Sequence, residues 1–403
     1  MKIGIDVRLW NETGVGRYIR NLIKYLQILD KKNEYVLFCL GEDEEEIKFQ
    51  ISPIRQTQGK NFKFQIVQSN IRWHTLAEQL KFPQILQNEK LDLMHFPYFS
   101  VPLFYKGKFV VTIHDLIINH FDTGEASTMP LPLYQLKRIG YKYIVSQVIT
   151  KADKIITVSN ATKDEIISHY LINPQKIVVT YEGVDSRIQS SEFPLRLSQS
   201  RLGRSEAGEA SRVQNKKKKD KQEYFLYVGN AYPHKNLNRL LEAFKILIQQ
   251  NSEVQLIMVG KEDFFYKKLK KFANDLNISH RIVFKHDVND EELSLLYQRA
   301  VALVSSSLME GFGLPVLEAM AHECLVLASD IPVYREIAED GAIYFDPTNV
   351  LNISETLIRA LKKDDKIMAQ KKKGLLLVKK FSWETLAQKT LEVYESCHRL
   401  RPG

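Results

Sequence analysis

The sequence predicts an α/β protein made of two doubly wound domains. Segments with the pattern of buried strands alternate with segments of helical periodicity, and such alternation is typical of parallel sheets covered by helices. The alternation fills residues 1–186, is interrupted by a polar stretch, and restarts at residue 223. At 403 residues the chain also exceeds the length that one hydrophobic core usually supports. We therefore expect domains at 1–186 and 223–380, separated by a segment at 187–222 and followed by residues 381–403.

In the first domain, the predicted strand Ile3–Val7 precedes a loop and a helix from Arg17 to Leu29. Apolar residues recur in this helix at spacings that place them on one face. The later strands expected in this domain are Val36–Leu40, Leu91–His95, Phe109–Ile113, Ile155–Val158 and Ile177–Thr180, with a helix at Ala161–Tyr170.

The second domain repeats the alternation. Its expected strands are Tyr224–Val228, Val254–Val259, Ile282–Phe284, Val301–Val304, Leu325–Ala328 and Ala342–Phe345. Its expected helices are 236–249, Tyr266–Leu276, Glu291–Arg299 and Val333–Ala338, followed by helical patterns at Ile353–Lys379 and Ser382–Leu400. Open α/β sheets bind ligands beyond the carboxyl ends of their strands, so two such sheets facing each other would place their strand-end motifs around one cleft.

The segment 187–222 carries most of the net positive charge of the chain. It holds ten Lys and Arg against four Asp and Glu, a surplus of six out of the net +9. With Phe193 as its one aromatic residue, it cannot bury enough apolar surface to offset the entropy lost on ordering, so we predict a flexible basic insertion. An electrostatic tether to an anionic membrane is the alternative. Because the surplus is concentrated in one segment, the charge does not indicate a nucleic-acid partner.

The cysteines and the apolar runs bear on the cellular compartment. Cys39, Cys324 and Cys397 lie far apart, so we expect reduced thiols rather than disulfides or a metal site. The first residues enter a strand directly and have no signal-peptide pattern. No apolar run approaches the roughly 18 residues that a membrane-spanning helix needs. The expected location is cytoplasmic, with peripheral contact at the inner face of the membrane as an extension of it.

The stretch from Glu310 to Glu318, Glu-Gly-Phe-Gly-Leu-Pro-Val-Leu-Glu, carries the strongest chemical signal in the chain. It follows a predicted buried strand and leads into a helix, for which Pro315 suits the first turn. Gly311 and Gly313 let backbone N–H groups approach a ligand, and the start of a helix attracts anions. Glu310 would then lie beside the anion, and Glu318 could accept two hydrogen bonds from a diol such as a ribose. An ordinary strand–loop–helix with two solvated glutamates is the alternative.

This Glu-x7-Glu pattern resembles the signature of the retaining family 4 glycosyltransferases, which have the GT-B architecture of two Rossmann-like domains facing across a cleft. The resemblance extends to Gly14-Val-Gly-Arg17, Thr112-Ile-His-Asp-Leu116, Asp153-Lys-Ile-Ile-Thr-Val-Ser159, Tyr227-Val-Gly-Asn-Ala-Tyr-Pro-His-Lys-Asn236 and Ala328-Ser-Asp-Ile-Pro-Val-Tyr-Arg-Glu336. Residues 187–222 are the main part outside it. The resemblance implies that the last helix, with Ser382 as its N-cap, crosses back onto the first, acceptor-side domain.

The resemblance assigns a nucleotide-sugar site to the strand ends of the second domain. The diphosphate would be held by the Lys235 side chain and by the backbone amides of Gly311, Phe312, Gly313 and Leu314. The dipoles of the adjacent helices would add positive potential. Asn230, also expected to bind the donor, stands where many relatives have an arginine. Its amide can donate a hydrogen bond but brings no charge, so His234 or Arg239 would help this clamp. An exposed loop lysine is the alternative for Lys235.

The remaining site residues follow from the same resemblance. His114 would face the donor sugar, with Asp115 fixing its tautomer, and Gly14 and Gly16 would let their loop approach the pyrophosphate. A structural histidine and a tight turn before a helix are the alternatives. The nucleoside base would meet Val288 and Asp290, whereas helix capping by Asn289 or Asp290 is the alternative there. No cluster has metal-ligand spacing, so we expect no metal.

The segment Leu131–Thr150 combines apolar residues with Lys137, Arg138 and Lys142. Such a segment could rest on a membrane surface beside a lipid-linked acceptor. Packing against the core, with a solvated opposite face, is the favoured alternative.

The sequence therefore predicts a retaining glycosyltransferase that moves a hexose, with mannose expected first, from a nucleotide diphosphate sugar to a saccharide or lipid-linked acceptor. GDP-mannose is the expected donor and a UDP-hexose the second choice, without a further cofactor. The expected catalytic residues are His114, Glu310 and Lys235. A nucleotide-sugar 2-epimerase on the same fold and a non-catalytic, membrane-tethered binding protein are the alternatives. A dinucleotide-dependent oxidoreductase is disfavoured, because no strand is followed by a full G-x-G-x-x-G.

Overall fold

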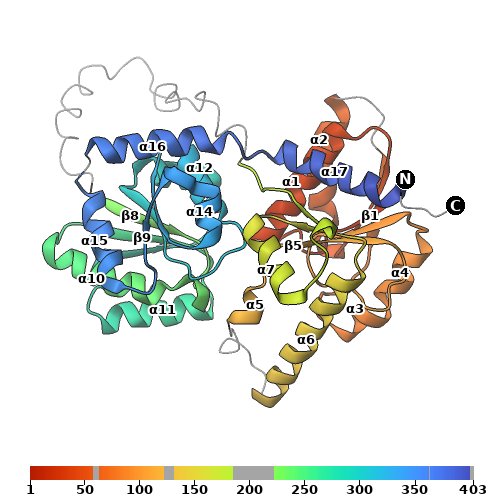
Figure 1. Cartoon of the computed structure of the whole chain (residues 1–403), viewed down its shortest axis with the longest axis horizontal. Coiled ribbons are helices and arrows are strands. Elements are labelled where there is room, and N and C mark those ends of the chain that lie inside the picture. Colours follow the sequence, from red (N-terminus) through yellow and green to blue (C-terminus); the bar gives the residue numbers. More distant parts are fainter. Residues whose placement is uncertain (58–62, 122–130, 185–221, 363, 400–403) are drawn as a thin grey trace, which may run out of the picture. The chain divides into compact units, whose positions relative to one another are not determined.

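The computed structural model describes residues 1–57, 63–121, 131–184, 222–362 and 364–399. The chain forms two compact units (Figure 1). The first consists of Met1–Gly183, Glu310–Leu314 and Phe381–Gly403, and the second of Val184–Met309 and Pro315–Lys380. The insertion predicted at 187–222 lies outside the described residues, apart from Gln222.

The first unit is built on a seven-stranded parallel sheet with the order β3-β2-β1-β4-β5-β6-β7. The strands are β1 (Lys2–Asp6), β2 (Glu34–Cys39), β3 (Lys63–Gln68), β4 (Leu93–Phe96), β5 (Phe109–Ile113), β6 (Lys154–Thr157) and β7 (Ile177–Val179). The predicted strands of this half are confirmed, whereas β3 was not predicted. The strand order reverses between β1 and β4, which is the kind of switch point where such sheets bind ligands.

Helices cover both faces of this sheet (Figure 1). They are α1 (Gly14–Leu29), α2 (Glu44–Thr57), α3 (Leu76–Leu80), α4 (Phe82–Asn88), α5 (Ile117–His120), α6 (Leu131–Lys151), α7 (Asn160–Tyr170) and α17 (Trp383–Arg399). Side-chain oxygens that accept a backbone N–H fix several helix starts: Thr75 caps α3, Ser159 caps α7, and the Ser382 hydroxyl accepts from Glu384. α17 packs against α1, β4 and β6, so the end of the chain is part of the first unit.

The core of the first unit lies between the sheet and these helices. Phe38 on β2, Phe96 on β4 and Val111 on β5 are buried together with Val145 and Ile149 on α6. Each such side chain contributes roughly 1.5–3 kcal/mol when it is fully removed from water. The apolar runs that predicted the strands are therefore the residues that hold the sheet to its helices.

The second unit is built on a six-stranded parallel sheet with the order β10-β9-β8-β11-β12-β13. The strands are β8 (Tyr224–Val228), β9 (Gln255–Val259), β10 (Ile282–Lys285), β11 (Ala302–Ser305), β12 (Leu325–Ser329) and β13 (Ala342–Phe345), all as predicted. The helices are α10 (Leu237–Gln250), α11 (Phe264–Asp275), α12 (Asp290–Arg299), α13 (Leu314–Ala321), α14 (Pro332–Ala338), α15 (Val350–Ala360) and α16 (Asp365–Val378). The strand order reverses at β8, again placing a switch point where predicted site residues follow.

One helical pattern of the second unit divides into two. The pattern predicted at Ile353–Lys379 is interrupted after Ala360, and a new helix begins at Asp365. The Asp364 carboxylate accepts a hydrogen bond from the Ile367 N–H at 3.0 Å, which satisfies a donor at the start of α16. Asp364 and Asp365 therefore mark the start of a second helix, which the apolar periodicity of residues 353–379 did not indicate.

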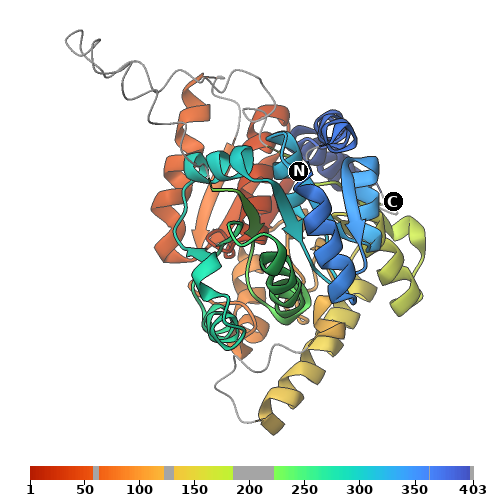
Figure 2. The ribbon, with the colours of Figure 1, turned by 90° about the vertical axis from the view of Figure 1, so that its left-hand side faces the viewer.

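The helix α6 has two different halves. Near its carboxyl end Val145, Val148 and Ile149 are buried, whereas Leu136, Ile139 and Tyr143 nearer its start are each more than half exposed. In Figures 1 and 2 the amino-terminal part of the helix (gold) extends beyond the body of its unit. Core packing therefore explains only the carboxyl-terminal half, and the favoured expectation for this segment is half right.

The described cysteines are buried free thiols. Burial raises the pKa of Cys39 to about 11 and that of Cys324 to about 12, so neither is an activated thiolate. In the part of the chain that the structure describes, no helix is both long and apolar enough to cross a membrane.

Candidate functional site

In the first unit, His114 at the end of one strand meets polar groups from the ends of two others. Pro97 follows β4, His114 follows β5, and Glu182 lies three residues beyond β7. The His114 ring, 8% exposed, places Nε2 2.9 Å from the Pro97 carbonyl oxygen and Nδ1 3.4 Å from Glu182 Oε1. The ring partners are thus Pro97 and Glu182 rather than Asp115, whose Oδ1 accepts from the Ile117 N–H at 2.9 Å. The prediction that Asp115 fixes the tautomer is corrected accordingly.

The loop Glu310–Leu314 lies against the His114 backbone within the same unit. A methyl group added to Gly311 would lie 2.0 Å from the His114 carbonyl oxygen, so glycine is required there by close packing. The Gly311 carbonyl accepts from Ser159 Oγ at 2.7 Å and from Thr162 Oγ1 at 3.3 Å. Gly313 has φ +108°, a backbone conformation that residues other than glycine rarely adopt. The strand-end loop of His114 and this glycine loop are therefore one assembly.

Phe312 anchors the loop through its side chain. The ring is 4% exposed and packs on Tyr181, at 6.3 Å between centroids, and edge-on to Phe381 at 5.9 Å. Because the ring is committed to this aromatic cluster, any contact with a donor would come from the Phe312 backbone. Glu310, half-buried, precedes the cluster. The donor-binding roles predicted for Gly311, Phe312, Gly313 and Leu314 remain predictions.

Gly14 and Gly16, predicted to approach the pyrophosphate, differ in their surroundings. A methyl group on Gly16 would lie 2.4 Å from the Trp10 carbonyl oxygen, so packing of α1 on its own loop explains this glycine. Gly14 is the first residue of α1 and faces open space at its Cβ position, so packing does not explain it. Close approach of a ligand remains a prediction for both glycines. Gly14 is the one of the two that packing leaves unexplained.

In the second unit, the loop after β8 is held against the loop after β11. Leu308 donates its N–H to the His234 carbonyl at 2.7 Å, and Ser306 Oγ donates to the Lys235 carbonyl at 2.9 Å. The Asn236 side-chain amide donates to the carbonyls of Ser306 and Pro347 at 3.1 and 2.7 Å. These four bonds fix the backbone of Lys235 at the carboxyl edge of the sheet and beside the start of α10.

Asn230, which stands in place of an arginine, is used within its own turn. Its Oδ1 accepts from the Tyr232 N–H at 3.3 Å, and its carbonyl accepts from the Tyr227 hydroxyl at 2.5 Å. Before it, Gly229 has φ +149° and packs so closely on Gly260 that a methyl group on Gly260 would lie 2.2 Å from the Gly229 carbonyl oxygen. The turn is therefore structurally specified.

Glu318 is the fifth residue of α13 (Leu314–Ala321) and is 4% exposed. Its Oε2 accepts a hydrogen bond from the Tyr297 hydroxyl at 2.8 Å. His322 donates to the Glu318 carbonyl through both its N–H and its Nδ1, and its ring stacks on Tyr297 at 5.3 Å. Since Oε2 already has a partner, a bidentate ribose contact would require that oxygen to be shared. The ribose role of Glu318 remains a prediction.

The loop after β10 contains the residues predicted to meet the base. Asn289 Oδ1 accepts from the Glu292 N–H at 2.8 Å and caps α12, so Asn289 is the N-cap and Asp290 the first helical residue. Val288 is half-buried, and Asp290 is exposed. Recognition of the nucleoside base by Val288 and Asp290 remains a prediction. Neighbouring His286 donates Nδ1–H to the Gly260 carbonyl at 2.6 Å, which ties this loop to the end of β9.

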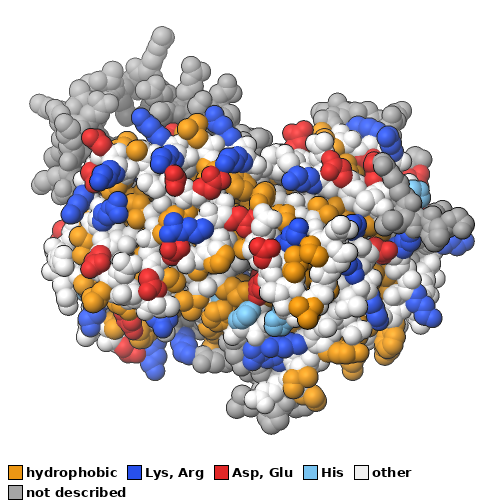
Figure 3. Space-filling view, viewed as in Figure 1, with side chains coloured by type: hydrophobic (Ala, Val, Ile, Leu, Met, Phe, Trp, Pro, Cys, Tyr) orange, Lys and Arg blue, Asp and Glu red, His pale blue; other side chains and the backbone are white. Residues whose placement is uncertain are grey.

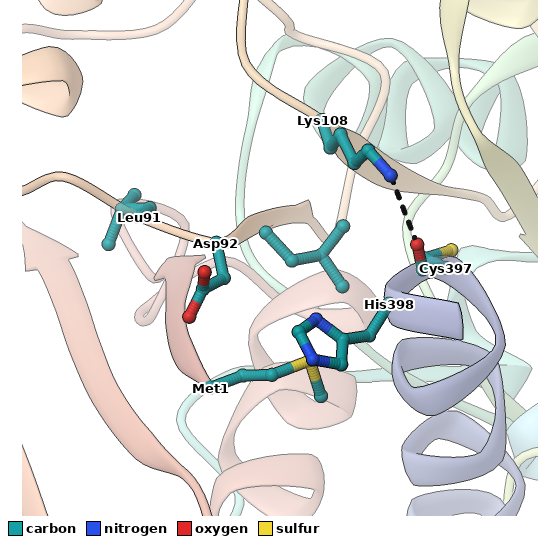
Figure 4. A pocket seen from close by; sticks show the side chains of 7 residues that line it. Met1, Leu91, Asp92, Lys108, Cys397 and His398 are labelled. Carbon is teal, nitrogen blue, oxygen red and sulfur yellow. Dashed lines mark hydrogen bonds between the residues drawn. The ribbon is translucent and has the colours of Figure 1, made fainter. Parts of the chain in front are cut away.

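A small cavity of about 230 Å³ opens at the opposite edge of the first sheet (Figure 4). It is lined by residues at the amino ends of β1, β4 and β5 and by the end of α17, among them Met1, Asp92, Lys108, Cys397 and His398. Lys108 Nζ donates to the Cys397 carbonyl across it at 3.3 Å. Because ligands of open α/β sheets bind at the carboxyl edge, this cavity is not the candidate site.

The charged side chains form neither a single basic face on the side drawn nor, among the described residues, a cluster of metal ligands. On the face drawn in Figure 3, Lys and Arg side chains are interspersed with Asp and Glu rather than gathered into one basic face. Among the described residues, no group of three or more His, Cys, Asp or Glu side chains is arranged to hold a metal ion.

Two side-chain partners of predicted site residues were missed from the sequence, Glu182 beside His114 and Tyr297 beside Glu318. Glu182 could have been found, because it follows a predicted strand at the same sheet edge as His114. Tyr297 could not, because nothing in a helical pattern identifies which residue will meet a buried carboxylate from another helix.

Family models match both halves of the chain. Residues 13–187 match the model described as Glycosyltransferase Family 4, and residues 209–377 match that of glycosyl transferases group 1. The O-antigen chain mannosyltransferase RfbU of Salmonella typhimurium is 28% identical over 275 residues, covering 68% of this chain and 66% of that protein. The O-antigen chain mannosyltransferase B of Escherichia coli is 27% identical over 394 residues, covering 95% of this chain and 96% of that protein.

A solved structure bears on the fold. HepE of Anabaena, in complex with UDP and glucose, aligns with a TM-score of 0.70 at 16% identity, covering 98% of this chain and all of that one. At this identity the likeness supports the GT-B architecture of two Rossmann-like domains, in agreement with the two parallel sheets.

Proposed function

The chain belongs to the glycosyltransferases that join a Family 4 domain to a group 1 domain, and on that premise we propose that it transfers mannose from GDP-mannose to a saccharide or lipid-linked acceptor. The supporting observation is the fixed loop of Lys235, whose backbone lies at the carboxyl edge of the second sheet beside a helix start. A cation beside a helix N-terminus suits a departing diphosphate. The two O-antigen relatives, which are named mannosyltransferases, support mannose as the transferred sugar.

The proposed reaction retains the anomeric configuration. The bond between the anomeric carbon and the diphosphate oxygen breaks, the acceptor oxygen bonds to that carbon from the same face, and a diphosphate oxygen takes the acceptor proton. Lys235, the amides of the 311–314 loop and the helix start stabilise the charge that develops on the diphosphate, usually the largest catalytic contribution. His114 and Glu310 orient the sugar, and Glu318 holds the ribose.

Nucleotide binding gives the first test. In a thermal-shift series with GDP, GDP-mannose, UDP and UDP-glucose, we expect the GDP compounds to raise the melting temperature with or without EDTA. A ligand at a hundred times its Kd stabilises the native state by about 2.7 kcal/mol. Lys235→Ala should reduce the shift, whereas Lys372→Ala, on the exposed side of α16, should preserve it. A shift with UDP compounds alone would contradict GDP-mannose as donor.

Product analysis separates the remaining alternatives. Incubation with the nucleotide sugar alone should leave its hexose unchanged if the protein is a transferase, whereas a 2-epimerase would convert it without an acceptor. Adding saccharide or lipid-linked acceptors should then release nucleoside diphosphate. Binding without release of nucleoside diphosphate for any acceptor would favour the non-catalytic alternative.

We also propose that α6 contacts an anionic membrane that carries the acceptor. The helix has four basic residues and no acidic residue, and it exposes Leu136, Ile139 and Tyr143. Exposed apolar residues among cations suit the interface of an anionic bilayer.

Sedimentation with lipid vesicles tests this contact. The protein should sediment with vesicles of equal parts phosphatidylcholine and phosphatidylglycerol, and the double variant Leu136→Ser/Ile139→Ser should lower the partition coefficient about 10-fold. Leu351→Ser removes a leucine that is 63% exposed on α15 and serves as the matched control. Equal sedimentation of the double variant and the control would contradict the assignment of α6.

A further inference from the structure

Both nitrogens of the His114 ring face oxygen atoms that can accept a hydrogen bond. The Pro97 carbonyl oxygen, 2.9 Å from Nε2, can only accept a hydrogen bond, so Nε2 carries a proton. On the other side of the ring, Nδ1 lies 3.4 Å from Glu182 Oε1. Glu182 and His114 are 4% and 8% exposed, so water screens this pair little.

The chemistry of the pair requires a proton between them. An unprotonated Nδ1 facing a carboxylate oxygen would set two lone pairs against each other in a poorly solvated site. The arrangement is favourable only when a proton lies between the two groups, on Nδ1 or on Glu182, at the 3.4 Å separation that the structure gives them. The imidazole is thus held from both sides, by a backbone carbonyl and by a carboxylate.

The segment that carries Glu182 is fixed by its neighbours. Tyr181 packs on Phe312, and a methyl group on Gly183 would lie 2.2 Å from the Trp383 backbone nitrogen. The Tyr18 ring packs edge-on against the His114 ring at 4.9 Å. Burial raises the pKa of Tyr18, and its neutral hydroxyl is hydrogen-bonded to Thr112 Oγ1 at 3.2 Å rather than to the Glu182 carboxylate. Glu182 therefore has little freedom to turn away from His114.

We propose that Glu182 is the positioning residue of His114: it holds a proton at Nδ1 and fixes the ring plane, so that sugar transfer depends on the pair rather than on the histidine alone. This inference rests on the proposed function for its catalytic part, but the pairing itself is independent of any substrate. A carboxylate that orients a histidine in this way is worth far more than its own contact, because a small misplacement of a reacting group costs about 10²-fold in rate.

Nitrogen NMR on the full chain tests the pairing without substrate. In protein labelled with ¹⁵N-histidine at neutral pH, the His114 signals are assigned as those lost in His114→Gln. The wild-type Nδ1 should show the shift of a nitrogen that carries or shares a proton. In Glu182→Gln, whose amide can donate to Nδ1, that signal should move to the range of an unprotonated nitrogen, while Nε2 keeps its proton. An unchanged Nδ1 signal would overturn the pairing.

Kinetics test the consequence. Glu182→Gln should lower kcat about 100-fold and leave the donor KM within about twofold, whereas Glu182→Asp, which keeps the charge but shortens the side chain, should lose less. Glu165→Gln serves as the control. It breaks a second His–Glu pair of the same unit, the half-exposed pair in which His120 Nε2 lies 2.7 Å from Glu165 Oε1, and it should leave kcat unchanged. Wild-type kcat in a folded Glu182→Gln would overturn the positioning role. If instead His114→Gln transfers sugar normally while the NMR result holds, the proposed role of His114 fails and the pairing stands.

Discussion

Replacing Glu310 with alanine is expected to lower kcat for sugar transfer by about 10³-fold, a loss of about 4 kcal/mol of transition-state stabilisation, with little change in nucleotide diphosphate binding. The reason for this division lies in how the loop is held. Ser159 and Thr162 bond to the Gly311 carbonyl, and the Phe312 ring is buried, so the loop keeps its position without the Glu310 side chain. The variant therefore removes a carboxylate from the proposed sugar site and leaves the amides of the diphosphate site in place.

Two further variants separate the charge of Glu310 from its hydrogen bonding. Glu310→Gln keeps a hydrogen-bonding side chain of the same size, so it should lose less than the alanine variant if Glu310 mainly orients the sugar, and equally much if its charge is required. Glu355→Ala, on the exposed face of α15, controls for the loss of a surface carboxylate. The measurement is initial rate of nucleotide release beside the thermal shift with nucleotide diphosphate. Normal transfer by Glu310→Ala would contradict the role assigned to this residue.

The sequence was most informative about the strands. Buried parallel strands are nearly continuous apolar runs, so β5, β8 and β12 could be placed from composition alone. The edge strand β3 alternates polar and apolar residues, Lys-Phe-Gln-Ile-Val-Gln, and lacks that signal. The short helices α3 and α4 begin at a capping threonine and at a Phe-Pro pair, local features that are weaker than periodicity. Elements at the margin of a sheet were thus the ones missed.

The candidate site shows the same division in physical terms. Residues at strand ends, such as His114 and Lys235, could be predicted because topology alone brings strand ends to one edge. Glu182 follows a predicted strand at the same edge and could have been placed there in the same way. Tyr297 meets Glu318 through packing between two helices, and no spacing in the sequence encodes that contact. Gly16 illustrates the reverse case: its glycine suggested a ligand, but the backbone of its own loop explains it.

The second large effect is expected on stability. Arg8, at the carboxyl end of β1, is buried between two carboxylates: its guanidinium donates to both Asp6 oxygens at 2.8 and 2.7 Å and to Glu78 Oε1 at 2.6 Å. Burial opposes the charge, but Asp6 and Glu78 outweigh it and raise the pKa of Arg8. Arg8→Met would leave two buried carboxylates without their cation, so we expect the first unit to lose about 3–5 kcal/mol of unfolding free energy.

Tryptophan fluorescence during urea unfolding measures the loss of stability in the first unit. All three tryptophans, Trp10, Trp73 and Trp383, belong to the first unit, so their signal reports on that unit alone. Adding Glu78→Gln to Arg8→Met should recover part of the loss, because one of the two uncompensated charges is removed. Lys48→Met, which breaks an exposed pair with Glu44, should leave the unfolding midpoint within error. If Arg8→Met unfolded at the wild-type urea concentration, the buried network would be dispensable, and its retention at the end of β1 would need an explanation other than stability.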